Sequence, residues 1–500
     1  MILTPSTHAG YELFHEGILA LSQMESDGIR VDVDYLDKAI ASSDIKIKAL
    51  RDKLRTHDIG RMWQKRFGVK MNLDSREQLG EILFSPTDKG GMGFKSRAKT
   101  ASGRPSTEIA DLEVIDLGCV RGWLKYQKLQ KAQGTYLKGI RREVVGDRCH
   151  PVYNLHLVVT FRSSCDSPNF QNQPVRDAEM GKLIRTSFIA SEGHVLGEID
   201  FKGAEVCVGA CYHKDPVMIE YITDVTKDMH RDMAMQIYKL KKAQVSKQIR
   251  HAAKNKFVFP EFYGDWWQSC AKSLWEEIDR SKLVVDGASL REHLKQKGIT
   301  SLGDWEPGGE DRHPLKGTFQ HHVEQVEDDF WNNRFSVYTE WKKKWYEDYL
   351  KKGCFKTLTG FDVSGVFRKN EVINYPVQGS AFHCLLWFII QLQKELRRLK
   401  MKTKLVGQVH DSVVADIAID EIDAFYAIVR RIINMDLPAH WKWIIVPLTV
   451  EFELSPIGKS WWDKRPIEPV ADSNNYKDKD GFIGTALEIL NKWKLNELPS

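Results

Sequence analysis

Two segments that lie far apart in the sequence each end an apolar run on an aspartate, and this pair constrains the fold most strongly. In VLGEIDFKGAE, at 195–205, a buried strand is predicted to end near Asp200, before a turn and a helix. In LVGQVHDSVVA, at 405–415, two β-rich arms place Asp411 at the tip of a tight hairpin. Carboxylates at the ends of rigid strands can hold two divalent cations about 4 Å apart, the arrangement used for in-line phosphoryl transfer. A single aspartate at a strand end is usually a turn former, so the residues between the two segments have to support this hypothesis.

The composition is that of an ordinary globular protein. The 500 residues predict two to four structural units. A net charge of +5 is too small to indicate nucleic-acid binding by itself, so that function requires local basic patches. Eight scattered cysteines without a CxxC pair favour a reduced, cytoplasmic protein without structural zinc. No apolar run approaches the roughly 18 residues of a membrane span and no signal peptide follows Met1, so neither membrane insertion nor secretion is expected.

Between the two aspartates, the segment SKQIRHAAKNKFVFPEFYG carries two cations and two aromatic rings at helical spacing. Arg250 and Lys254 share one face of a predicted helix, where they could hold a triphosphate and oppose the charge that develops during transfer. Phe259 and Tyr263 have the same spacing and offer flat faces for a base pair. Pro260 fits this pattern poorly, because an interior proline removes a backbone hydrogen bond and kinks a helix.

These residues resemble the motifs of family A DNA polymerases, the group that contains bacterial DNA polymerase I and many phage replicases. The first palm motif of that family, Asp-x-Ser-x-x-Glu, resembles DFKGAE, with Asp200 and Glu205 in place. The fingers motif, Arg-x-x-x-Lys followed by Phe-x-x-x-Tyr-Gly, is matched by the segment 250–264 with one extra residue between its two halves. The third motif, Gln-Val-His-Asp-Glu, corresponds to residues 408–412, with Ser412 in place of the final Glu.

Four shorter stretches resemble other conserved segments of the same family. They are TFRSSCDSPNFQNQPVR, LIRTSFIA, DMHRDMA and NYPVQGSA. Together with the third motif, they assign contacts with DNA to Arg162, Asn172, Arg185, Asn374, Gln378 and His410. The third of these stretches gives His230 a position that faces the phosphates of the nucleotide.

The resemblance implies an enzyme that extends primer–template DNA with dNTPs through two Mg²⁺ ions. Its metal ligands would be Asp200, Asp411 and the backbone carbonyl of Phe201. Its nucleotide-binding residues would be Lys254, which also acts in catalysis, and Arg250, His230, Phe259, Tyr263 and Glu205. Glu205 would exclude a ribose 2′-hydroxyl. Arg162, Gln378 and His410 would test the primer end through minor-groove acceptors that all correct base pairs share.

The implied fold is of the α/β kind, in the α+β arrangement: a right hand with an antiparallel-sheet palm, helical fingers and a helical thumb, without an exonuclease domain. Its expected parts are a helix leading from palm to thumb at 1–35, the thumb at 36–145, the palm with motif A at 146–227, the fingers at 228–352 with a surface insertion at about 265–325, the palm with motif C at 353–463, and a peripheral C-terminal tail at 464–500. Within the thumb, residues 57–110 are rich in Gly, Ser and Lys and are expected to be irregular.

Two other functions stay open. A single-subunit RNA polymerase has a similar palm, and Ser412 favours it because His-Asp-Ser is the usual third motif there, whereas Glu205 and the segment 374–378 favour deoxynucleotides. The other is a DNA-binding replication accessory with a decayed catalytic centre, which the two aspartates and the two fingers cations argue against. Since Met1 lies almost directly before the thumb, proofreading is expected to be absent or supplied by a separately encoded 3′–5′ exonuclease. The favoured interpretation is a monomeric phage replicase that acts in the host cytoplasm.

Overall fold

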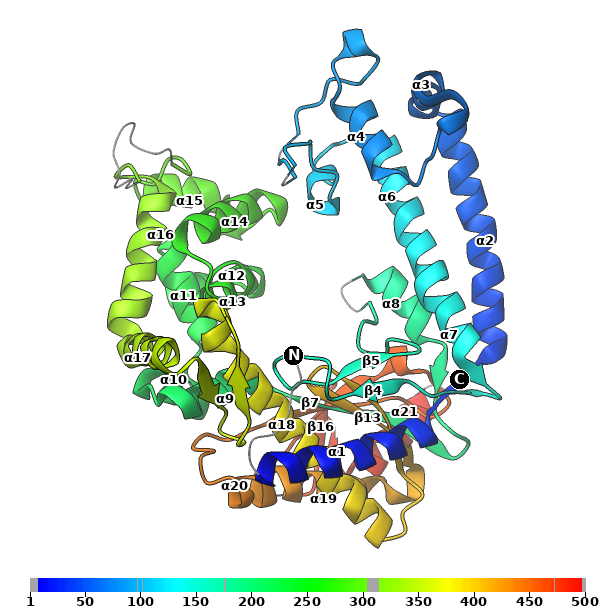
Figure 1. The fold of residues 1–500 in the computed structure, drawn as a ribbon, viewed down its shortest axis with the longest axis vertical. Helices are drawn as coiled ribbons and strands as arrows, with labels where there is room; N and C mark the ends of the chain where they lie inside the picture. The colour runs from blue at the N-terminus through cyan, green and yellow to red at the C-terminus, as the bar shows by residue number, and fades with distance from the viewer. Residues whose placement is uncertain are drawn as a thin grey trace.

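The computed structural model describes residues 8–496 except 97, 101, 175–176, 304–313 and 472. An antiparallel sheet forms the base of the molecule, and two helical arms rise from it on opposite sides (Figure 1). We call the base the palm, the arm that contains α2 to α7 the thumb, and the arm that contains α11 to α17 the fingers. This arrangement confirms the predicted right hand of the α+β class. None of the described helices is both long and apolar enough to cross a membrane.

The palm is a seven-stranded sheet in the order β12–β13–β7–β14–β15–β16–β17. Its central strands are β12 (Lys404–Val409), β13 (Ser412–Ala418), β7 (His194–Phe201) and β14 (Val450–Leu454). On one face, Phe201 packs on Phe388 of α18 (Lys369–Arg398), and Phe452 packs on Tyr426 of α19 (Ile422–Arg431). The other face is covered by a layer around Trp461. Because both faces are buried, β12, β13 and β7 are mostly apolar, whereas acidic and apolar residues alternate in β14.

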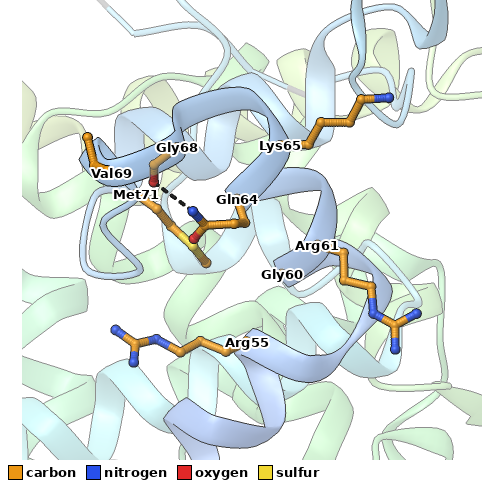
Figure 2. Close-up of a pocket in the computed structure, with 8 residues that line it drawn as sticks. All are labelled: Arg55, Gly60, Arg61, Gln64, Lys65, Gly68, Val69 and Met71. Carbon is orange, nitrogen blue, oxygen red and sulfur yellow. Dashed lines mark hydrogen bonds between the residues drawn. The ribbon is translucent and has the colours of Figure 1, made fainter.

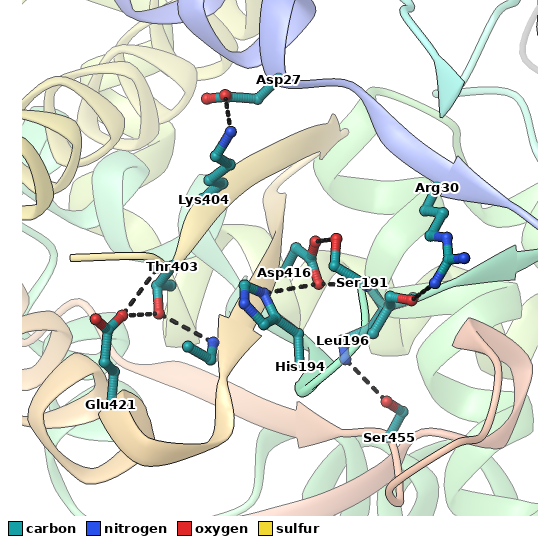
Figure 3. A network of polar contacts seen from close by, with 12 residues as sticks. Asp27, Arg30, Ser191, His194, Leu196, Thr403, Lys404, Asp416, Glu421 and Ser455 are labelled. Carbon is teal, nitrogen blue, oxygen red and sulfur yellow. Dashed lines mark hydrogen bonds and ion pairs between the residues drawn. The ribbon is translucent and has the colours of Figure 1, made fainter. Parts of the chain in front are cut away.

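Polar contacts fix the register of these strands (Figure 3). Asp416 is buried in β13 and accepts hydrogen bonds from the backbone N–H of Ser191, at 3.0 Å, and from the hydroxyl of the same residue. His194 Nδ1 lies 3.4 Å from Asp416 Oδ1. Lys404 Nζ, on β12, lies 2.8 Å from Asp27 Oδ1 at the end of α1 (His8–Asp27). A one-residue slip would turn every side chain of β13 to the opposite face, and these contacts disfavour it.

The C-terminal segment belongs to the palm, so the prediction of a peripheral tail was wrong. β15 (Arg465–Pro469), β16 (Tyr476–Asp478) and β17 (Ile483–Gly484) extend the sheet beyond β14, and α21 (Ala486–Asn496) packs on them. Ile467, Tyr476 and Trp493 are almost fully buried. The charge of this segment misled the prediction because strands near a sheet edge carry polar residues that face water.

The thumb is built on two long helices. These are α2 (Val33–Thr56) and α6 (Gly118–Lys131), and α6 continues through a π-helical segment, Ala132–Leu137, into α7 (Lys138–Glu143). At the tip, α3 (Asp58–Phe67) and α4 (Arg76–Phe84) replace much of the irregular structure that was predicted for 57–110. A separate hydrophobic cluster that includes Trp63, Leu79 and Trp123 supports this tip. An open pocket of about 690 Å³ on the tip is lined by Arg55, Arg61 and Lys65 among others (Figure 2).

The fingers consist of helices that surround a core of aromatic rings. They are α11 (Met229–Tyr238), α12 (Lys247–Ala253), a π-helical segment (Lys254–Val258), α13 (Phe259–Tyr263), α14 (Trp267–Arg280), α15 (Leu290–Gln296), α16 (Phe319–Asp328) and α17 (Ser336–Lys352). The insertion at about 265–325 is more than surface structure, because Leu274, Leu290 and Phe319 are fully buried in this core. Residues 304–313, inside that insertion, lie outside the described residues.

Short elements complete the three parts and connect them. A four-stranded sheet of β2 (Val144–Val145), β3 (Arg148–Cys149), β1 (Ile29–Val31) and β6 (Phe188–Ile189) joins thumb and palm. The remaining strands pair as hairpins: β4 (Val152–Asn154) with β5 (Ser164–Asp166), β8 (Val284–Val285) with β9 (Ala288–Ser289), and β10 (Cys354–Lys356) with β11 (Asp362–Ser364). The remaining helices are α5 (Ile109–Leu112), α8 (Ala178–Arg185), α9 (Ala204–His213), α10 (Pro216–Thr223) and α20 (Leu437–His440).

Candidate active site

The pairing of β7 with β13 makes the two strand-end aspartates neighbours. Asp200 lies opposite Ser412, the residue that follows Asp411, and the N–H of Phe201 donates to the backbone oxygen of Asp411 at 3.1 Å. Opposite residues on antiparallel strands have Cα atoms about 4.5–5.5 Å apart. We call the end of the palm sheet at which Asp200, Asp411 and the backbone of Phe201 are neighbours the catalytic end of the palm sheet.

The surroundings of Asp200 disfavour its charged form. Burial, followed by the nearby carboxylates of Glu198, Asp411 and Glu451, raises the pKa of Asp200 to about 7, although Lys464 lowers it. Glu451 lies opposite Asp200 on β14. The sequence predicts a strand at 445–454 but not the register of that strand, so Glu451 was missed.

This acidic centre fits a divalent cation that takes most of its ligands from substrate and water. No group of three or more His, Cys, Asp or Glu side chains is arranged to hold a metal within the described part of the chain. A cation of the Mg²⁺ type needs only one or two carboxylates when phosphate oxygens supply further ligands. The repulsion that raises the pKa of Asp200 is also the interaction that a bound cation would relieve.

Arg162 connects the aspartate pair to the start of α9. Its guanidinium donates to Glu205 Oε1 at 3.1 Å and to Asp411 Oδ1 at 3.3 Å. The hydroxyl of Tyr263, the last residue of α13 in the fingers, donates to Glu205 Oε2 at 3.0 Å. Tyr263 is 53% exposed and presents its ring to solvent. Glu205 thus links the palm, the loop that carries Arg162 and the fingers.

In the fingers, the side chains of Arg250, Lys254 and His230 lie near the phenyl ring of Phe259. Arg250 Nε donates to Asp228 Oδ2 at 2.6 Å, and Lys254 Nζ lies 4.9 Å from the centre of the Phe259 ring. The His230 ring meets the same phenyl ring edge-on at 5.8 Å. Burial, followed by the charges of Arg250 and Lys254, lowers the pKa of His230 to about 4, so the imidazole is neutral at pH 7. Its Nδ1 atom is buried without a hydrogen-bond partner among the described residues.

A π-helical segment at Lys254–Val258 accommodates the extra residue of the fingers motif. The N–H of Phe259 bonds to the oxygen of Lys254, five residues earlier, in place of the usual four. A π-turn holds one more residue than an α-turn without breaking the helix. Pro260 then falls in the first turn of α13, directly after the π-turn, where a missing N–H is tolerated. Both irregularities of the sequence motif have this one explanation.

Two residues that were predicted to contact DNA, His410 and Arg162, line one pocket beside the hairpin tip. His410 forms that tip in a left-handed conformation, with φ 51°. With Arg162, Gln171 and others it lines a pocket of about 200 Å³. Gln408 is buried, and its side-chain oxygen accepts from Ser163 at 2.8 Å and from Gln171 at 2.6 Å. Gln171 lies in a stretch that the sequence singled out, but the role of its own side chain was missed.

Three amides complete the predicted contacts with DNA. Asn172 is exposed in the loop after β5, and Asn374 and Gln378 lie one turn apart on α18. A Cβ on Gly379 would lie 2.4 Å from the backbone oxygen of Thr160, so α18 approaches the segment that leads to Arg162 as closely as only glycine allows. Gln378 is therefore held beside the loop that carries Arg162.

Arg185 is buried in the palm, and a buried guanidinium is poorly placed for the predicted contact with DNA. It is 5% exposed, and its guanidinium lies 4.0 Å from the centre of the Trp461 ring. Burial lowers its pKa, while the charges of Glu198 and Glu453 act in the opposite direction. Arg185 packs within the layer on the Trp461 side of the palm sheet, because its helix, α8, is amphipathic and turns this residue inward.

Comparisons with known proteins agree with the geometry. The family model of DNA polymerase family A matches residues 46–286 and 331–463. DNA polymerase I of Bacillus subtilis (strain 168) is 28% identical over 458 residues, which cover 89% of this chain and 45% of that protein. The DNA polymerase of Bacillus phage SP01 is 24% identical over 544 residues, covering 96% of this chain and 53% of that protein. The chain spans about half the length of these relatives.

A solved structure has the same fold. The POL domain of Pol1 from M. smegmatis, in complex with DNA primer-template and dNTP, superposes with a TM-score of 0.67 at 21% identity, over 89% of this chain and 70% of that one. The two ranges matched by the family model make up more than half of the present chain and contain both aspartates and the fingers helix α12. The chain therefore belongs to DNA polymerase family A.

Proposed function

We propose that the chain is a template-directed DNA polymerase that adds dNTPs to the 3′ end of a primer by two-metal phosphoryl transfer. The neighbouring carboxylates of Asp200 and Asp411 carry this proposal. With the backbone carbonyl of Phe201 they would hold two Mg²⁺ ions, whose chemistry when bound is to activate the primer hydroxyl and to offset the charge of the triphosphate. The names of the relatives, DNA polymerase I and DNA polymerase, support the same activity.

The fingers residues would bind the triphosphate through different kinds of contact. Arg250 and Lys254 bring positive charge to the phosphate oxygens. His230 is neutral, and its unpartnered Nδ1 can donate a hydrogen bond once that nitrogen carries the proton. Tyr263 presents an exposed ring at the end of the same helix, on which the nascent base pair can stack. Closure of this helix over a correct pair would complete the site, which makes selection depend on induced fit.

A primer-extension assay with Mg²⁺ and dNTPs tests the proposal. Asp411→Asn keeps the size of the side chain and removes its charge, so the extension rate is expected to fall by at least about a hundredfold, or about 2.7 kcal/mol. The matched control is Asp420→Asn, which removes an exposed carboxylate paired with Lys402 on the surface and is expected to keep full activity. Full extension by Asp411→Asn would remove the basis of the proposal.

A single-subunit RNA polymerase is the second candidate, and Ser412 is the observation that favours it. Glu205 argues for deoxynucleotides because its carboxylate is fixed by Arg162 and Tyr263 at the entrance to the nucleotide site. A competition between dNTPs and rNTPs on one primed template separates the two functions. Preferential use of rNTPs, or initiation without a primer, would establish the second candidate.

Primer–template DNA and dNTPs are the proposed partners, in line with the complex reported for the M. smegmatis domain. The monomeric state, the separately encoded exonuclease and the cytoplasmic location stay predictions of the sequence. An assay on a primer with a mismatched 3′ end tests the second of these, because the chain alone is expected to leave such a primer undegraded.

A further inference from the structure

One more carboxylate is buried at the catalytic end of the palm sheet, and the roles assigned above do not use it. Glu198 lies two residues before Asp200 on β7 and is 8% exposed. Ser412 Oγ donates to Glu198 Oε1 at 2.9 Å, and Trp461 Nε1 donates to Oε2 at 2.8 Å. Lys464 Nζ forms an ion pair with the same Oε2.

The packing of the sheet alone does not explain Glu198. A buried carboxylate is costly unless it is paired and hydrogen-bonded, and an apolar side chain of similar size would fill the same space without that cost. The ion pair with Lys464 and the hydrogen bonds from Trp461 and Ser412 offset this cost, so the surroundings of Glu198 are built for a carboxylate.

The partner of Glu198 is the position at which the chain departs from the family pattern. Residues 408–412 follow Gln-Val-His-Asp-Glu except that Ser412 replaces the final glutamate. Ser412 pairs with Asp200 across β13 and β7, so Ser412, Asp200 and Glu198 lie on one face of the sheet. A glutamate at position 412 would place its carboxylate against that of Glu198. Where the family pattern has a carboxylate on β13, this chain has Ser412, and the carboxylate beside it comes from β7.

We propose that Glu198 is a positioning residue, which holds the tip that carries Asp411 opposite Asp200 and supplies from β7 the acidic group that the family pattern has at position 412. The inference rests on the proposed function. The hydrogen bond to Ser412 acts on the residue next to Asp411. Lys464, which also pairs with Glu453 of β14, holds the carboxylate from the other side. Three adjacent strands, β13, β7 and β14, are thereby tied together behind the aspartate pair.

An exchange of the carboxylate between the two strands tests this proposal. Glu198→Ala is expected to lower kcat for primer extension by about 10- to 100-fold, with the KM for dNTP little changed. It is also expected to weaken binding of Mn²⁺ by about tenfold, measured by calorimetry without DNA or nucleotide. Adding Ser412→Glu to Glu198→Ala returns a carboxylate from β13 and is expected to restore both quantities to within about threefold of the original chain.

Matched variants separate positioning from folding. Asp420→Asn removes a carboxylate whose partner is Lys402 and which has no part in the contacts of Glu198, so Mn²⁺ binding is expected to stay unchanged. Glu198→Gln keeps the size of the side chain and its hydrogen bond to Ser412. It is expected to unfold at nearly the original temperature in EDTA and to bind Mn²⁺ less tightly than the original chain.

Two outcomes would overturn the proposal. One is that the exchange variant binds Mn²⁺ no better than Glu198→Ala, and the other is that Glu198→Gln binds Mn²⁺ as tightly as the original chain. Failure of the original chain to extend a primer would instead overturn the proposed function. The Mn²⁺ titrations do not depend on extension, so they would still decide the role of Glu198.

Discussion

Asp200 is held where its ionised form is disfavoured, and this makes the stability of the metal-free protein depend on pH. Its pKa is about 7 in the folded chain, against about 3.9 for an unperturbed aspartate. Below about pH 4 both folded and unfolded chains hold the proton, so the group has no effect. Between about pH 4 and pH 7 only the folded chain holds it, so stability falls as the pH rises. Above pH 7 the full penalty is present.

Replacing Asp200 by the uncharged Asn removes that penalty. At pH 8 in EDTA, Asp200→Asn is expected to raise the free energy of unfolding by about 2 kcal/mol. Each unit of the pKa shift represents roughly 1.4 kcal/mol, and only about half of the full shift is counted because the side chain is partly exposed. At pH 4 the two chains are expected to be equally stable. Urea unfolding at both pH values measures the difference. A variant that is less stable than the original chain at pH 8 would contradict the prediction.

The side chain of Glu205 is fixed by two partners, so its removal should change the choice of sugar. Glu205→Ala is expected to raise incorporation of rNTPs relative to dNTPs by about tenfold or more, or about 1.4 kcal/mol, because the space for a 2′-hydroxyl opens. Tyr263→Phe is the matched control, since it removes only the hydroxyl that donates to Glu205. It is expected to change the ratio by less than about threefold. An unchanged ratio for Glu205→Ala would rule out the steric role.

Among the helices and strands, the sequence predicted those that depend on the pattern of apolar residues within a short segment. The hairpin at 405–417 and the strand that ends near Asp200 follow from runs of β-branched and apolar residues. The extra residue of the fingers motif could equally indicate a loop, a bulge or a π-turn, because each absorbs one residue. Glu451 shows the other limit, since its place beside Asp200 depends on a strand register that no local pattern encodes.

The π-helical segment leads to a prediction about deletions. Removing one residue within the segment should preserve activity, whereas removing one residue from α12 should not. Deletion of Asn255 together with Pro260→Ala converts the segment to a regular helix and leaves Arg250 four residues from Lys254. Primer extension is expected to stay within about tenfold of the original rate. Deletion of Ala252 rotates Lys254 by about 100° away from Arg250 and is expected to lower the rate by at least about a hundredfold. Equal losses in the two variants would refute the role given to this segment.

The whole molecule shows why the boundary of the palm could not be predicted. The family model ends at residue 463, but Lys464 reaches back to Glu198 and the next strands continue the sheet. In β15 to β17 the apolar residues are few and separated by charged ones, so their pattern is typical of a solvated tail. These strands join the sheet because β15 pairs with β14. Such pairing between strands cannot be predicted from the local composition of either strand.

Binding of DNA by the thumb tip can be measured without any nucleotide addition. Its pocket carries three cations, of which Arg61 lies 3.7 Å from Asp58, whereas Arg55 and Lys65 have no ion-pair partner in the described part of the chain (Figure 2). We expect both free cations to contact the DNA backbone. Replacing Arg55 and Lys65 by alanine should then weaken binding of a primer–template and reduce the slope of log affinity against log salt by about 2.

The same measurement distinguishes this local contact from a general effect of net charge. Lys477 and Lys479 are exposed on β16 and in the turn after it, and their replacement by alanine removes the same charge from the palm side of the molecule. That pair of substitutions is expected to leave the salt slope unchanged, because released counterions are counted only where a phosphate is neutralised. If both double variants lower the slope equally, or neither does, the duplex does not pass over the thumb tip.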